Sequence, residues 1–66
     1  MTKRETRAYA KQRMSALMAN VKFVAEMREH AIAQGDVVRA QAWLGEMDAS
    51  RKRWYSWSEI YRKAHL

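Results

Sequence analysis

Almost nothing in this sequence interrupts a helix. The 66 residues include no proline and only two glycines, Gly35 and Gly45, and helix-forming residues occur throughout. A chain of this length makes at most one domain with a small core, and without cysteine it has no disulfide to stabilise that core. The sequence therefore predicts a single all-α domain that gains stability by self-association.

The strongest turn signal is Gln-Gly-Asp at 34–36. Gly35 can adopt the left-handed conformation that ends one helix, and Asp36 can cap the next. At the other end, Thr2 and Glu5 fit a capping box that starts the first helix. We predict one helical-hairpin domain over 1–66, with antiparallel helices over about 2–34 and 37–64 and a turn at about 35–36. We also expect two hairpins to dimerise into a four-helix bundle.

The second arm contains a heptad seam, in which apolar or small residues recur at alternating steps of three and four. Its members are Ala40, Trp43, Met47, Ser50, Trp54, Trp57, Tyr61 and Ala64. The seam crosses Gly45 and Asp-Ala-Ser without a phase shift, which favours one continuous helix, with a break near 48–50 as the alternative. Aromatic residues at this spacing usually fill a core, so the seam is predicted to point inward.

The first arm contains two seams. A wide apolar stripe is predicted to face the second arm, and it consists of Ala10, Met14, Leu17, Val21, Val24 and Ala31, with Met18, Ala25 and Ile32 alongside. The other seam is predicted on nearly the opposite side, and it consists of Tyr9, Arg13, Ala16, Asn20, Phe23, Met27 and His30. An aligned apolar patch of this kind indicates an interface. We therefore interpret the second seam as either the homodimer contact or a docking surface for a foreign partner.

Positive charge is concentrated at both ends of the chain. Residues 1–13 and residues 51–66 each have five basic and one acidic side chain, so each segment carries +4, whereas 14–50 has three basic and five acidic ones, a net −2. A hairpin brings the two basic segments together at one end, with a charge of about +8, and this favours an anionic partner, either nucleic acid or an acidic protein surface. The alternative is a solvated surface with no partner. The candidate patch consists of Lys3, Arg4, Arg7, Lys11, Arg51, Lys52, Arg53, Tyr55, Arg62 and Lys63.

Catalytic and cofactor motifs are missing from the sequence. His30 and His65 are isolated, Glu26 with His30 gives too few groups for a metal site, and there is no glycine-rich phosphate loop. We expect no enzymatic activity, no cofactor or metal, and no small-molecule substrate. The N-terminus does not resemble a signal peptide and no apolar run approaches membrane-spanning length, so we expect a cytoplasmic protein with no membrane span.

The opening MTKRE and the two heptad-bearing arms resemble the Rop family, plasmid-encoded RNA-binding proteins that dimerise as antiparallel four-helix bundles. In that family, a face of the first helix with a lone aromatic among amide and basic side chains contacts paired RNA loops. The similar set in this sequence is Phe23, Asn20, Arg13 and Gln12. The three tryptophans and the strongly basic balance depart from the family pattern. The stretch AIAQGDVVRAQAWL is also similar to the turn of a tetratricopeptide hairpin, a turn chemistry that many helical hairpins share.

Two classes of function fit these features. The first is a small regulatory protein that binds another protein and blocks or modulates it, as phage and plasmid inhibitors of host factors such as transcription regulators do. The face with Phe, Met, Tyr and Arg side chains favours this class, because these residue types are enriched in protein interfaces. The second is a basic RNA- or DNA-binding hairpin dimer that contacts phosphates with its open end. The sequence narrowly favours a protein target. The location of Phe23 and Met27 discriminates, because burial in a dimer would leave the basic end as the best remaining site.

Overall fold

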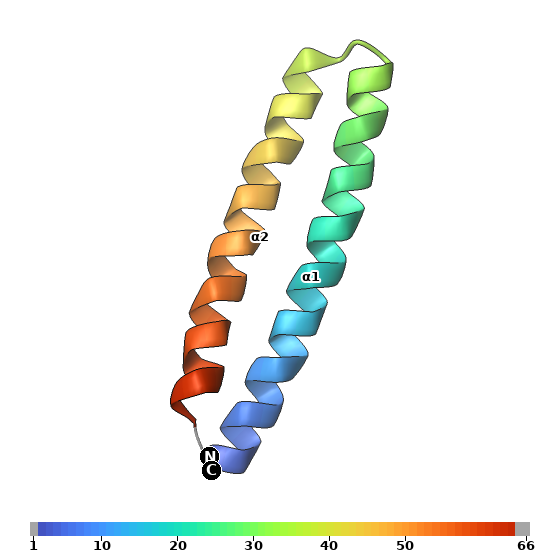
Figure 1. The fold of residues 1–66 in the computed structure, drawn as a ribbon. Helices are drawn as coiled ribbons and strands as arrows, with labels where there is room; N and C mark the ends of the chain where they lie inside the picture. Colours follow the sequence, from blue (N-terminus) through green and yellow to red (C-terminus); the bar gives the residue numbers. More distant parts are fainter. Residues whose placement is uncertain (1, 65–66) are drawn as a thin grey trace.

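Two long helices, joined by a tight turn, lie side by side along their whole length (Figure 1). A computed structural model of the chain describes residues 2–64. Helix α1 spans Lys3–Ala33 and helix α2 spans Val37–Lys63, and α2 continues through Gly45 and residues 48–50 without a break. The predicted all-α antiparallel hairpin is confirmed. It measures 49 × 14 × 14 Å between Cα atoms, and both ends of the described chain lie at the end opposite the turn.

Both helix starts are capped by the residues that the sequence indicated. The Thr2 hydroxyl oxygen accepts a hydrogen bond from the Glu5 amide at 3.1 Å, and the Glu5 carboxylate accepts one from the Thr2 amide at 3.4 Å. Gly35 has a φ of 73°, the left-handed conformation that costs glycine least. The Asp36 carboxylate then accepts from the Arg39 amide at 3.0 Å, and this caps α2.

The core is a narrow line between the helices. In α1 its buried members are seven residues apart, and they are Ala10, Leu17, Val24 and Ala31. In α2 the buried members are Ala40, Met47 and Ser50, and Ala64, which caps the end of α2, is buried as well. The aromatic members of the predicted α2 seam are half-buried around this line, as the heptad pattern indicated; they are Trp43, Trp54, Trp57 and Tyr61.

The prediction that the whole wide apolar stripe of α1 faces α2 is wrong for two of its members. The side chains of Met18 and Ile32 are 52% and 53% exposed. A single neighbouring helix covers about one seam of another helix, so α2 covers the line of Leu17 and Val24 and leaves the edge of the stripe open. Neither helix, within residues 2–64, is long and apolar enough to cross a membrane.

Candidate partner-binding surface

Two further rows of side chains run along the hairpin, one on each side of the core line. In α1 the core line contains the buried Leu17 and Val24. The residues that follow them, Met18 and Ala25, belong to one row. The residues that precede them, Ala16 and Phe23, belong to the other row. Successive helix residues lie about 100° apart around the axis, so the two rows are about 160° apart on α1. The hairpin therefore presents two different faces, and each has its own side chains from α2.

The first face, here named the Phe23 flank, consists of Tyr9, Asn20 and Phe23 of α1 with Trp43 and Trp57 of α2. The Phe23 and Trp43 rings meet edge to face with centroids 6.2 Å apart, and the Tyr9 and Trp57 rings do so at 5.4 Å. Tyr9 and Phe23 remain 45% and 52% exposed. Each outer ring is thus held by a tryptophan of the other helix and still offers about half of its surface.

The predicted position of this seam, nearly opposite the second arm, is wrong. Asn20 donates a hydrogen bond from Nδ2 to Ser50 Oγ at 2.7 Å, and Ser50 is 0% exposed. Tyr9 and Phe23 contact the tryptophans described above, so the seam borders the α1–α2 interface. The physical reason is the size of the indole rings, which extend sideways beyond the core line and meet the adjacent row of α1.

The polar members of the seam are more open than its aromatic members. Arg13 lies one turn beyond Tyr9 and Arg53 lies one turn before Trp57, and both arginines are exposed. Farther along, Met27 is half-buried and His30 is exposed near the turn. An open groove beside Phe23 is lined by Asn20, Phe23, Val24, Arg39, Ala42, Trp43 and Glu46.

Trp43 also has an unsatisfied polar atom. Its indole Nε1 is buried and, among the described residues, has no hydrogen-bond acceptor. A buried donor without an acceptor costs about 1–3 kcal/mol. The sequence indicated Trp43 as a core residue, but it did not indicate that Trp43 supports Phe23, since this pairing depends on how the two helices align.

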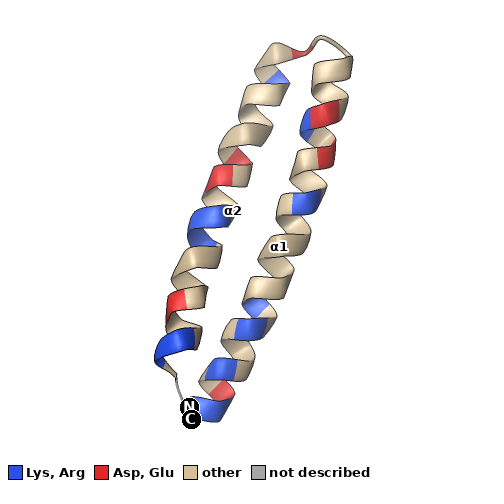
Figure 2. Cartoon of the chain, viewed as in Figure 1, with Lys and Arg blue, Asp and Glu red and all other residues tan. Residues whose placement is uncertain are grey.

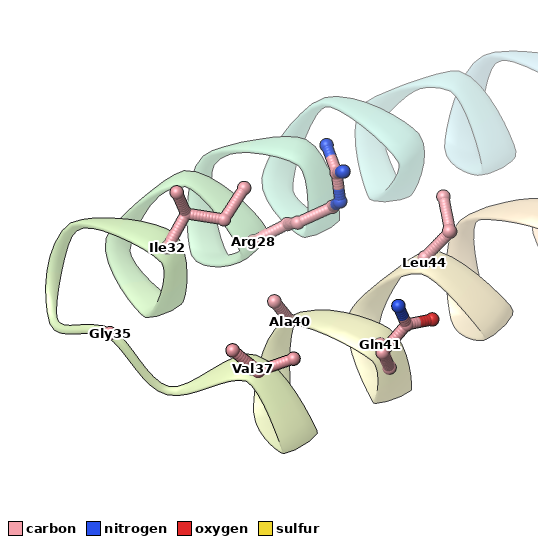
Figure 3. A pocket seen from close by; sticks show the side chains of 7 residues that line it. All are labelled: Arg28, Ile32, Gly35, Val37, Ala40, Gln41 and Leu44. Carbon is pink, nitrogen blue, oxygen red and sulfur yellow. The ribbon is translucent and has the colours of Figure 1, made fainter.

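The second face, here named the Met18 flank, consists of Met18, Ala25, Ile32, Val37, Leu44 and Tyr55. Two hollows lie along it: Met18, Arg51, Trp54 and Tyr55 line one, and Arg28, Ile32, Gly35, Val37, Ala40, Gln41 and Leu44 line the other near the turn. Figure 3 shows Ile32 of α1 and Val37 and Leu44 of α2 around the latter. Sequence reasoning missed this face, although Val37 and Leu44 have the same seven-residue spacing as Met18, Ala25 and Ile32.

Lysine and arginine positions are most frequent in the half of the hairpin toward the termini (Figure 2). Nine members of the candidate patch are exposed: Lys3, Arg4, Lys11, Arg51, Lys52, Arg53, Tyr55, Arg62 and Lys63. Arg7 differs, because its guanidinium lies 4.1 Å from the centre of the Tyr61 ring and donates to the Tyr61 hydroxyl at 3.0 Å. Arg7 therefore contributes to packing between the helices. The exposed residues can meet a partner, although Lys63 also pairs with Glu59 on the preceding turn at 3.5 Å.

Within residues 2–64, no three side chains of His, Cys, Asp or Glu come together in a way that could hold a metal ion. His30 is exposed near the turn, and His65 lies outside the described residues. Comparison with known protein families, with curated proteins and with solved structures gives no match. The functional interpretation of this chain consequently depends on the two flanks and the basic end.

Proposed function

We propose that this chain is a small regulatory protein without enzymatic activity, and that it binds and blocks or modulates another protein through the Phe23 flank. The observation that carries the proposal is the pair of aromatic edge contacts, in which Trp57 supports Tyr9 and Trp43 supports Phe23. Aromatic side chains that are already fixed in place lose little conformational freedom on binding. Such residues, with arginine, dominate the binding energy of protein interfaces.

The spacing along the flank indicates what the partner looks like. Tyr9 and Phe23 are two heptads apart, which corresponds to about 21 Å along α1. The exposed Arg13 and Arg53 lie between the two aromatic pairs. A complementary surface has two apolar side chains or pockets separated by about that distance, with acidic groups between them. We therefore propose a partner whose binding surface is acidic and partly apolar, and inhibition of a host factor such as a transcription regulator is one use of such a contact.

The test compares the protein with two variants that each shorten one exposed apolar side chain. Phe23→Ala removes an anchor of the flank, and Val38→Ala, the control, shortens an exposed side chain that belongs to neither flank. Tagged proteins capture partners from nuclease-treated lysate, and any protein retained at moderate salt is purified and titrated against all three chains by calorimetry. We expect Phe23→Ala to weaken binding of that purified partner at least tenfold and Val38→Ala to leave it unchanged.

Circular dichroism accompanies these titrations, because Phe23→Ala must keep its helicity for the comparison to be valid. Equal binding by Phe23→Ala and the unchanged chain would refute the Phe23 flank as the docking surface. If capture disappears with nuclease, the protein-binding proposal is wrong and the second candidate takes its place.

The second candidate is a basic hairpin that binds RNA or DNA, which the resemblance to the Rop family also favours. The supporting observation is the concentration of exposed lysine and arginine at the open end, where two segments of +4 meet. A protein of this kind, without a base-reading motif, contacts phosphates, and its affinity falls steeply with salt. Titration of a labelled RNA hairpin and a DNA duplex at two salt concentrations separates this candidate from the first.

A further inference from the structure

We propose that the Met18 flank is the contact between two copies of this chain, and that the copies pack antiparallel, with the turn of one beside the open end of the other. The proposal concerns a different face from the Phe23 flank, and its test does not require a partner. It rests on three observations: the surface area of the hairpin, the composition of the flank and the distribution of charge.

The hairpin exposes more surface than a protein of its mass usually does. A compact monomer of 7.8 kDa has an accessible surface of roughly 4,400 Å², whereas this chain exposes 5232 Å². The excess is about 800 Å², which is the area that each partner usually buries in a stable protein–protein interface. Covering one long face of the hairpin would therefore bring its exposed surface to the usual level.

Of the two faces, the Met18 flank has the composition of a self-contact. Its exposed members include Met18, Ile32, Val37 and Tyr55, and the last two are 69% and 68% exposed. These side chains occur on both helices and extend from the turn to Tyr55, which lies 18 residues from Val37, or about 27 Å along a hairpin 49 Å long. In an antiparallel pair the strips of the two copies meet around Met18 and Tyr55. The rest of each strip lies against the open half of the other copy, where Lys11 continues the row of Met18 and its apolar stem can cover apolar surface.

Charge then decides the orientation of the copies. The half of the hairpin toward the termini carries +8, the sum of +4 for residues 1–13 and +4 for residues 51–66, and residues 14–50 carry −2. A parallel pair would place two +8 halves side by side, whereas an antiparallel pair places each +8 half beside the weakly acidic half of the other copy. With two-fold symmetry, the antiparallel arrangement packs α1 against α1 and α2 against α2.

In this arrangement, Arg51 of one copy lies close to Arg51 of the other copy. Met18 is the midpoint of α1, and Arg51 lines the same hollow as Met18, so both lie near the two-fold axis when the copies overlap fully. Arginine has a long apolar stem that can cover apolar surface while its charge remains in water. Arg51 is exposed, and Asp48, one turn away on α2, is a nearby acidic group for the guanidinium of the other copy.

The first measurement is the mass in solution, by sedimentation equilibrium over a range of concentrations. The unchanged chain should sediment as a species of twice 7.8 kDa. Met18→Gln with Ile32→Gln should weaken the dimer at least tenfold, whereas Phe23→Gln, at a site of the same exposure on the other flank, should leave it within about threefold. A monomeric unchanged chain, or a dimer weakened by Phe23→Gln and not by the double variant, would overturn the proposal.

The second measurement determines the orientation and leaves both flanks intact. Gln34 is exposed beside the turn and the chain has no cysteine, so Gln34→Cys accepts a single spin label. Gln34 lies 16 residues from Met18, and at a rise of 1.5 Å per residue the antiparallel copies place their labels about 40–50 Å apart. A parallel pair, with neighbouring helices 8–10 Å apart, places them at about 15–25 Å, and such a distance from pulsed dipolar spectroscopy would refute the antiparallel arrangement.

Discussion

The hydrogen bond between Asn20 and Ser50 provides a quantitative test of the core. Asn20 Nδ2 donates to Ser50 Oγ at 2.7 Å, and Ser50 has no accessible surface whereas Asn20 is half-buried. Removing one partner leaves the other unsatisfied, and the cost depends on whether water can reach the group that remains. The two single alanine substitutions should therefore have unequal effects, although they break the same bond.

Asn20→Ala leaves a fully buried hydroxyl without its partner, and we expect a loss of about 1–3 kcal/mol in the free energy of unfolding. Ser50→Ala leaves an amide that water can reach, and we expect a smaller loss of about 0.5–1.5 kcal/mol. Both substitutions gain a similar amount of helix propensity, about 0.5 kcal/mol, so this contribution cancels in the comparison. The double substitution leaves no orphaned group and should cost less than the sum of the single ones by about 1 kcal/mol.

Thermal unfolding followed by circular dichroism measures all four proteins. A loss of 1 kcal/mol lowers the melting temperature of a domain of this size by about 4–8 °C, so the difference between the two single variants is measurable. All samples need the same chain concentration, because association makes the melting temperature depend on concentration. Additive effects within about 0.5 kcal/mol, or a larger loss from Ser50→Ala than from Asn20→Ala, would show that the reasoning about the buried hydroxyl is wrong.

Two further substitutions test the turn and the unsatisfied indole. Gly35→Ala should lower the free energy of unfolding by about 1–2 kcal/mol, because φ is 73° and the open space around the position makes the cost purely conformational. Gly35→Asn should cost less, since asparagine tolerates this conformation better than alanine. Equal melting temperatures for the glycine and alanine proteins would contradict the conformational cost. Trp43→Phe should change the free energy of unfolding, measured by chemical denaturation, by less than about 1 kcal/mol, because the loss of apolar area is offset by removal of the buried donor. Trp43→Ala should cost about 3 kcal/mol or more. A similar loss from both variants would mean that the unsatisfied donor does not affect stability.

The hairpin itself was predictable because its signals are local. The capping box at Thr2, the left-handed Gly35 and the cap at Asp36 each depend on residues within one turn of the chain. The α2 seam was predictable for a similar reason, since one helix with three tryptophans at heptad spacing has one evident inner face.

The side of α1 that packs against α2 was not predictable in the same way. Three rows of apolar residues, which include Met18, Leu17 and Phe23, compete on that helix, and the periodicity of one helix does not decide among them. The choice depends on contacts between residues far apart in the sequence, such as Asn20 with Ser50, which are 30 residues apart. Arg7 illustrates the same point, because a count of charges places it in the basic patch, whereas its position opposite Tyr61 places it in the packing.

The two proposals support each other through geometry. If two copies pack through the Met18 flank, the Phe23 flank of each copy faces outward, so dimerisation does not remove the proposed docking surface. The antiparallel arrangement also places the basic residues nearest the termini, such as Lys3 and Lys63, at opposite ends of a hairpin 49 Å long, while Arg51 of each copy lies near the two-fold axis. Tyr9 and Trp57 lie near the open end, with Arg13 and Arg53 one turn away. A compact acidic protein surface can therefore contact aromatic and basic groups of one copy together, and this arrangement favours protein docking over phosphate binding along an extended nucleic acid.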